Sequence, residues 1–281
     1  MAIVFITGTS TGIGFATAVT LAQKGHKVYA SMRNLQKSPE LQNLAEKENL
    51  PINIITMDVN DGASVKNGIG SVLQKEGWID VLINNAGVSQ AGPVEELPIH
   101  SFEEEMQTNY FGTLRCIQAV LPSMRERKSG CIINNTSVLG RMYMQFQSGY
   151  CASKAAVEAL SESLAQEVEP YNIRIAIVEP GVIATPIFRK GKSHVSVNYP
   201  RVKRVSAFYG AFLKRQIQPE VVAEAINDII IGKSKKFRNL AGADALPLIR
   251  YRASLTDEEW ISSVNTDDDT WVENLTQRSL D

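Results

Sequence analysis

Thr7-Gly8-Thr9-Ser10-Thr11-Gly12-Ile13-Gly14 lies between a short apolar run and a helical pattern, and this turn indicates the fold. Its three glycines let the backbone turn tightly, let a pyrophosphate approach and let the helix pack on the sheet. A pyrophosphate there would meet free amides and the positive end of a helix. Similar glycines also occur in plain turns, but their place between a strand and a helix favours binding. The residues expected to contact a dinucleotide are Gly8, Ser10, Thr11, Gly12, Ile13 and Gly14.

Outward from this turn, short apolar runs alternate with longer helical patterns. The candidate strands are Ile3–Thr7, Lys27–Ser31, Asn53–Met57, Val81–Asn84, Cys131–Asn135, Arg174–Val178 and Lys236–Leu240. The candidate helices are Gly14–Lys24, Ser38–Glu48, Gly62–Glu76, Ser101–Arg127, Gly149–Glu169 and Pro219–Ile231. Near-continuous apolar strands between helices are typical of parallel sheets covered on both faces. The sequence therefore predicts an α/β fold, a single Rossmann-like domain over residues 1–281 with a doubly wound parallel sheet of about seven strands.

Two segments fall outside the alternation. Residues 185–218 are long and irregular, with eight basic residues and no acidic one. Loops of such length in compact domains are commonly lids. The extension over residues 257–281 has eight acidic residues and one base, Arg278. We expect either that both segments are solvated or neutralise each other, or that the basic one draws anionic substrates.

Composition excludes several classes of function. The chain of 281 residues is 44% hydrophobic and 21% charged, with a net charge of -1. Such a balance gives no reason to expect nucleic acid or a membrane surface as the main partner. No apolar run reaches transmembrane length, and strand-like residues begin at Ala2, which leaves no room for a targeting peptide. The three cysteines have no metal-like spacing and fit a reducing compartment. We expect a cytoplasmic protein.

The end of the second strand indicates the cofactor. A carboxylate there would bind the ribose 2′-hydroxyl of NAD, whereas a cation would bind the 2′-phosphate of NADP. This chain has Arg33 there and no acidic residue nearby, although a surface arginine would look the same. We expect NADP(H), with NAD(H) as the alternative because Thr11 is neutral where a second cation could stand.

Tyr150 and Lys154 stand four residues apart in a predicted helix and are therefore neighbours on its surface. An ammonium about 4 Å from a phenol, at an effective dielectric of about 20, favours the phenolate by about 4 kcal/mol. That equals roughly three pKa units, so we expect the pKa of Tyr150 to fall near 7. A phenol tuned in this way serves as a general acid or base for a carbonyl or alcohol oxygen.

The glycine turn, Asn84-Asn85-Ala86-Gly87 and the Tyr150/Lys154 pair together resemble the short-chain dehydrogenase/reductase family over about residues 2–186. The resemblance implies that Ser137, 13 residues before Tyr150, is the catalytic serine that positions the substrate oxygen. It implies that Asn109 opens its helix and holds a water that relays protons to Lys154. Further cofactor contacts implied by the resemblance are Asp58, Val59, Asn85, Ala86, Gly87, Tyr150, Lys154, Pro180, Gly181 and Thr185.

Within the family, residues 27–33 and the long chain after Thr185 resemble the branch of 17β-hydroxysteroid and retinol dehydrogenases. The segment from Pro186 onward matches no pattern, so the substrate stays open. Apolar residues of this segment would either line an apolar pocket or pack on the core as lid residues. They are Ile187, Phe188, Phe208, Tyr209, Phe212 and Leu213.

These observations predict an oxidoreductase that interconverts a ketone or aldehyde and an alcohol with NADP(H). The substrate would be a small apolar molecule of steroid, retinoid or lipid type. Two alternatives are a regulatory NADP(H) sensor without turnover and an isomerase or dehydratase on the same scaffold. The family's oligomers imply a homodimer or homotetramer built on Ser101–Arg127 and Gly149–Glu169.

Overall fold

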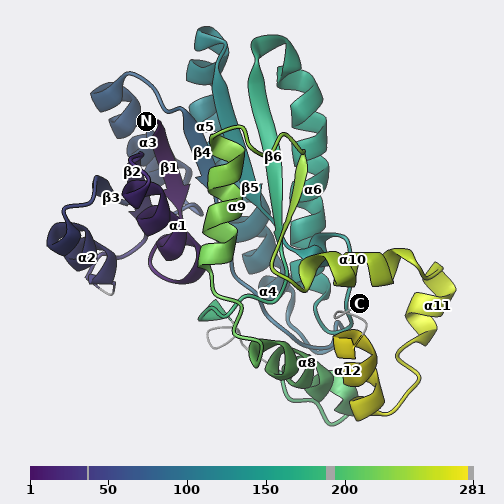
Figure 1. Cartoon of the computed structure of the whole chain (residues 1–281). Helices are drawn as coiled ribbons and strands as arrows, with labels where there is room; N and C mark the ends of the chain where they lie inside the picture. The colour runs from purple at the N-terminus through teal and green to yellow at the C-terminus, as the bar shows by residue number, and fades with distance from the viewer. Residues whose placement is uncertain (37, 188–193, 278–281) are drawn as a thin grey trace.

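The computed structural model describes residues 1–36, 38–187 and 194–277. Its centre is a seven-stranded sheet in the order β3-β2-β1-β4-β5-β6-β7, with every neighbouring pair of described strands parallel (Figure 1). This confirms the predicted fold class. The strands are β1 (Ile3–Thr7), β2 (Lys27–Met32), β3 (Ile52–Thr56), β4 (Val81–Asn84), β5 (Gly130–Asn135), β6 (Ile173–Pro180) and β7 (Arg238–Ala241).

Strand β1 shows why the central strands are mostly apolar. All five of its residues are buried, and successive side chains point to opposite faces of the sheet. Ile3 and Phe5 pack into the core under one helical layer, and Val4 and Ile6 pack into the core under the other. The first layer contains α3 (Gly62–Glu76), α5 (Gly112–Arg127) and α6 (Ser148–Val168). The second contains α1 (Gly12–Gln23), α2 (Glu40–Glu48) and α9 (Glu220–Ile230).

The strand order places a crevice at the carboxyl ends of β1 and β4. The chain runs outward from β1 to β3 and then returns to β4 on the other side of β1. Loops that follow these two strands therefore leave in opposite directions. Ligands of doubly wound sheets bind at such a switch point.

The predicted helix Ser101–Arg127 is interrupted. The structure has α4 (Ile99–Glu105), a π-helical turn over Met106–Phe111, and then α5. A π turn holds one extra residue per turn and is often found at functional sites. Asn109 lies within it.

The segment 185–218 is not irregular as predicted, because part of it forms helix α8 (Lys203–Leu213). The acidic extension is also helical, with α11 (Asp257–Ser262) and α12 (Asp268–Gln277) following α10 (Ala245–Ala253). Helices α8 and α12 lie side by side below the sheet in Figure 1 and contact each other. Local charge suggested two solvated segments, but apolar residues at helical spacing fold both into one packed layer.

The basic segment and the acidic extension neutralise each other in part, which is one of the two outcomes expected from the sequence. Lys203 and Arg204 both pair with Asp268. Within the described residues no helix combines the length and apolar character needed to cross a bilayer.

Candidate functional site

The glycine turn has the conformation that its glycines allow. Gly8 and Gly12 have φ angles of +71° and +62°, which favour glycine. A Cβ on Gly8 would lie 2.7 Å from the Cα of Ala86, and a Cβ on Gly14 would collide with the carbonyl oxygen of Gly8. The absence of side chains at Gly8 and Gly14 therefore allows the turn, the loop after β4 and the start of α1 to pack closely. In this arrangement the free backbone amides at the start of α1 can bind an anionic ligand.

Asn85 fastens this turn to the loop after β4. Its Nδ2 donates to the carbonyl oxygens of Thr7 (2.9 Å) and Gly8 (3.0 Å). The hydroxyl of Thr7 in turn accepts the backbone N–H groups of Asn85 (2.9 Å) and Ala86 (3.0 Å). The two predicted cofactor-binding segments thus form one hydrogen-bonded unit at the switch point.

A cavity of about 650 Å³ begins at this unit. Most residues predicted for the site line it together: Gly8, Ser10, Thr11, Gly12, Ile13, Arg33, Asp58, Val59, Asn85, Ala86, Gly87, Ser137, Tyr150, Lys154, Pro180, Gly181 and Thr185. Two predicted residues, Gly14 and Asn109, do not line it. Gly14 lies behind the turn against Gly8 and Asn85, and Asn109 is buried.

One end of the cavity carries the features expected of a site for the adenosine part of a dinucleotide. Arg33 follows β2, is exposed, and makes no hydrogen bond or ion pair with any described residue. Asp58 and Val59 follow the neighbouring strand β3, and Asp58 is the one carboxylate among the described lining residues. A free guanidinium at this position fits a 2′-phosphate. The residues present therefore fit NADP(H).

Ser137, Tyr150 and Lys154 converge on the cavity from two elements. Ser137 caps a short 3-10 turn after β5 and accepts the N–H of Leu139 (3.1 Å). Its side chain is also hydrogen-bonded to that of Tyr150. Lys154 is buried, lies 5.7 Å from the ring centre of Tyr150, and donates to the carbonyl oxygen of Asn135 (2.9 Å). The three groups thus share one wall of the cavity.

The electrostatics of this wall differ from the expectation. Burial raises the pKa of Tyr150 above 10, and the Ser137 hydrogen bond opposes this only in part. Burial lowers the pKa of Lys154 to about 8, opposed by the charge of Glu158. The predicted pKa near 7 for Tyr150 is therefore wrong in this structure. The cost of taking a phenolate out of water, which the spacing of Tyr150 and Lys154 does not reveal, outweighs the attraction of the ammonium.

Hydrogen bonds to residues outside its own helix hold the side chain of Asn109 in place. Its Oδ1 accepts the N–H of Val88 (2.9 Å), and its Nδ2 donates to the Val88 carbonyl (2.9 Å) and to Ser153 Oγ (2.8 Å). A Cβ on Gly87 would lie 3.3 Å from Asn109 Oδ1 and 3.7 Å from Lys154 Nζ. Asn109 and the ammonium of Lys154 thus both lie beside Gly87, and the role of Asn109 in a water relay stays a prediction.

The other end of the cavity was only partly foreseen. Of the apolar residues named from the sequence, Ile187, Phe208, Tyr209 and Leu213 line it, Phe212 is buried in the core, and Phe188 lies outside the described residues. Apolar lining residues missed by sequence reasoning are Val138, Leu139, Met142, Val182 and Val205. The helical spacing of the apolar residues between 205 and 213 could have indicated α8. None of the five described basic residues between 194 and 218 lines the cavity, which disfavours the expectation that they draw anionic substrates.

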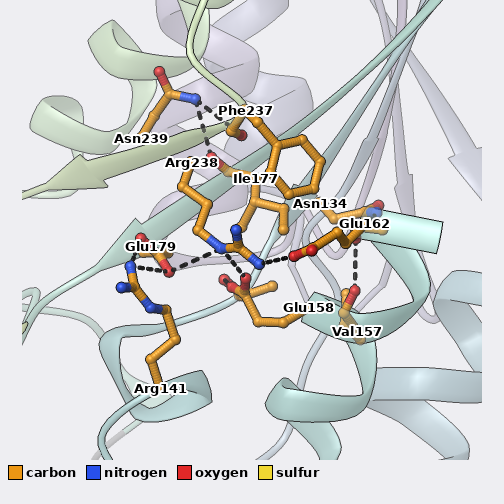
Figure 2. A network of polar contacts seen from close by, with 12 residues as sticks. Asn134, Arg141, Val157, Glu158, Glu162, Ile177, Glu179, Phe237, Arg238 and Asn239 are labelled. Atoms are coloured by element: carbon orange, nitrogen blue, oxygen red, sulfur yellow. Dashed lines mark hydrogen bonds and ion pairs between the residues drawn. The ribbon is translucent and has the colours of Figure 1, made fainter. Parts of the chain in front are cut away.

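An ionic network that was also missed from the sequence joins β6 and β7 to α6 (Figure 2). The Arg238 guanidinium of β7 pairs with Glu158 (2.9 Å) and Glu162 (2.6 Å) of α6 and lies 4.0 Å from Glu179. Glu179, fully buried, also pairs with Arg141 (3.3 Å). Buried carboxylates are rare unless they are paired, so the presence of Glu179 in an apolar strand could have indicated a buried ion pair.

Comparisons with known proteins identify the family of this chain. The family model described as short chain dehydrogenase matches residues 2–195. Retinol dehydrogenase 8 of Bos taurus is 34% identical over 265 residues, which cover 89% of this chain and 84% of that protein. Human 17-beta-hydroxysteroid dehydrogenase type 1 is 33% identical over 265 residues, 89% of this chain and 80% of that protein. These relatives confirm the predicted branch.

A shorter match links the chain to a 3-ketodihydrosphingosine reductase of Bacteroides thetaiotaomicron. The two are 38% identical over 180 residues, 64% of this chain and 63% of the relative. The chain thus spans less than two thirds of that relative's length.

Solved structures share the fold over most of the chain. A short-chain dehydrogenase from Streptomyces avermitilis has a TM-score of 0.78 and 33% identity, covering 95% of this chain and all of that one. A gluconate 5-dehydrogenase from Burkholderia cenocepacia in complex with NADP and tartrate has a TM-score of 0.64 and 29% identity, with 67% and 74% covered. With its sheet, its glycine turn and its Ser-Tyr-Lys wall, this chain belongs to the short-chain dehydrogenase family of oxidoreductases.

Proposed function

We propose that this protein interconverts a ketone or aldehyde and the corresponding alcohol with NADP(H) as the hydride donor or acceptor. The observation that carries the proposal is the shared cavity. The glycine turn and Arg33 line it together with Ser137, Tyr150 and Lys154. A substrate in the part lined by Tyr150 would therefore lie beside the nicotinamide end of a dinucleotide bound at the turn.

Bound NADPH would supply a hydride to the carbonyl carbon. Its pyrophosphate would lie on the amides of the glycine turn, and its 2′-phosphate would pair with Arg33. Pro180, Gly181 and Thr185 line the cavity where the nicotinamide would lie. The guanidinium of Arg33, which pairs with none of the described residues, supports a preference for NADP(H) over NAD(H).

Tyr150 would donate the proton that turns the substrate oxygen into an alcohol. Its raised pKa keeps the phenol protonated at neutral pH, which suits the acid needed for carbonyl reduction. Ser137 would hold the same oxygen by its hydroxyl. Lys154 would stabilise the phenolate that remains after proton transfer, and Asn109 would anchor the loop and the water from which Tyr150 regains its proton.

The substrate we propose is apolar and of steroid, retinoid or lipid type. Beyond the catalytic wall the cavity is lined by Leu139, Met142, Val205, Phe208 and Leu213. Such a lining buries hydrocarbon and leaves few partners for a polar substrate. The names of the two relatives that cover 89% of the chain, a retinol and a steroid dehydrogenase, are in keeping with this class.

The test is NADPH oxidation with a panel of aldehydes and ketones, with products identified by mass spectrometry. Tyr150→Phe should lower kcat by about 10²- to 10⁴-fold because the proton donor is lost, while NADPH binding stays within about twofold. Tyr143→Phe is the control, because Tyr143 is exposed and does not line the cavity. Unchanged kcat in Tyr150→Phe, or substrate conversion without NADPH oxidation, would refute the proposed reaction.

A further inference from the structure

Helix α8 forms a wall of the proposed substrate region. Its residues that line the cavity are Val205, Ser206, Phe208, Tyr209, Gly210 and Leu213. Tyr209 and Tyr150 pack against the same core cluster, and both line the cavity. A shift of α8 would therefore change the space next to the proton donor.

Arg204 joins α8 to the chain's C-terminal part, which packs against this helix. The side chain of Arg204 is 1% exposed, and its Nε pairs with Asp268 Oδ1 (2.6 Å). Its other nitrogens donate to the carbonyl oxygens of Val264 (2.8 Å) and Thr266. A buried guanidinium that satisfies one carboxylate and two carbonyls fixes the geometry of the segment that surrounds it.

Aromatic contacts continue this attachment toward the cavity. The guanidinium of Arg204 lies 5.8 Å from the ring centre of Trp271, and that ring lies 6.2 Å from the ring of Phe208. Phe208 in turn lines the cavity. At the end of α8, Arg215 donates to the carbonyl of Thr276 (2.7 Å). A continuous set of contacts therefore joins residues 264–276 to the substrate wall.

We propose that residues 264–276, the C-terminal clamp, determine substrate size by holding α8 against the cavity, with Arg204, Asp268 and Trp271 as positioning residues. The proposal rests on the proposed function for what the cavity binds. The dinucleotide end of the cavity lies on β1, β2 and β4, and none of the clamp residues lines the cavity. Loosening the clamp should therefore alter binding of large apolar substrates and leave NADP(H) binding intact.

The first experiment compares Arg204→Met with Lys203→Met in the full chain. Both residues pair with Asp268, but Lys203 is 71% exposed whereas Arg204 is buried. We expect Arg204→Met to lower kcat/KM for dodecanal about tenfold or more, because a partner of a buried ion pair is lost. The values for butanal, and the dissociation constant of NADPH, should change less than about twofold. Lys203→Met should leave all three unchanged, because an exposed pair contributes little.

A second measurement decides the proposal independently of turnover. Hydrogen exchange of the α8 amides should rise in Arg204→Met and in the milder Asp268→Asn, with exchange in β1 and β4 unaltered. The two changes should be non-additive when combined, since they break one interaction. Equal losses of kcat/KM for both aldehydes, or unaltered hydrogen exchange of the α8 amides, would overturn the proposed role of the C-terminal clamp. A wild type that reduces no carbonyl would instead overturn the proposed function, and the exchange data would still decide the clamp.

Discussion

The hydroxyl of Thr136 donates a 2.6 Å hydrogen bond to the carboxylate of Glu158, which also accepts from Arg238 (2.9 Å). Thr136 directly precedes Ser137, and Glu158 follows Lys154 by one turn of α6. Glu158 thus connects the segment that carries Ser137 to α6, the helix that carries Tyr150 and Lys154. The negative charge of Glu158 also keeps the pKa of Lys154 from falling further.

Glu158→Gln should move the alkaline limb of the pH profile. Burial places the pKa of Lys154 at about 8, so reductase activity that needs the ammonium is present below this pH and lost above it. Tyr150 and Asn135 also face the ammonium, but neither carries a charge at neutral pH. Removing the Glu158 charge should lower the pKa of Lys154 and shift the limb of kcat downward by about one pH unit.

The matched control is Glu162→Gln. Glu162 pairs with the same arginine but is 59% exposed, so its loss should leave the limb in place. The assay is kcat for one aldehyde between about pH 6 and pH 10, with circular dichroism to follow folding. An identical limb in Glu158→Gln and the wild type would show that Glu158 does not act on Lys154.

Arg33→Ser should reduce the preference for NADPH. A charge-assisted hydrogen bond contributes about 1.5–3 kcal/mol, so kcat/KM with NADPH should fall about tenfold to a hundredfold while the value with NADH changes little. Arg125→Ser, at an exposed arginine on α5 outside the cavity, should change neither value. Equal losses with both cofactors would place Arg33 outside the 2′-phosphate site.

Gly14→Ala should abolish dinucleotide binding. The added methyl group would collide with the carbonyl of Gly8 and with Asn85 Nδ2, which fasten the turn. Overpacking of this kind costs about 1–3 kcal/mol of stability, and the displaced turn would no longer present its amides. Isothermal titration with NADPH and thermal unfolding measure both effects.

Gly70→Ala serves as the control for that change, because a Cβ on this residue of α3 has no neighbour within 4 Å. Alanine is the better helix former by about 1 kcal/mol, so this variant should bind NADPH normally and unfold at the same or a higher temperature. Wild-type NADPH affinity in Gly14→Ala would contradict the assignment of the turn.

Glu105→Gln should change how stability depends on pH. Burial raises the pKa of Glu105 from 4.5 to about 7, although the carboxylate accepts the N–H of Gln90 (2.8 Å). Since the folded state holds the proton more tightly, this group's contribution is complete below about pH 4.5 and is lost as the pH rises through 7. The free energy of unfolding should fall by about 3 kcal/mol as this contribution is lost.

The measurement is the free energy of unfolding from urea denaturation at about pH 5 and about pH 8. The stability of Glu105→Gln should be less sensitive to this change of pH than that of the wild type, whereas Glu103→Gln, at an exposed residue two positions earlier, should behave like the wild type. A wild type equally stable at both pH values would mean that Glu105 ionises freely.

The sheet and the dinucleotide turn could be predicted because their signals are local. Apolar runs define buried strands such as β1, and the glycines of Thr7–Gly14 allow φ angles and close approaches that other residues resist. The spacing of Tyr150 and Lys154 and the family resemblance that singled out Ser137 were also read from the sequence, and the structure places the three residues on one cavity. Each of these signals is carried by short motifs that can be recognised in the sequence.

Other properties depend on residues far apart in the chain, and only the tertiary structure decides them. The pairing of Arg238 with Glu158 joins residues 80 positions apart, and that of Arg204 with Asp268 joins residues 64 apart. The sign of the pKa shift of Tyr150 was also beyond the sequence, which shows the neighbouring lysine but not the burial that outweighs it. Periodicity determined which elements form here, whereas desolvation and long-range packing determined how the charged groups around the site behave.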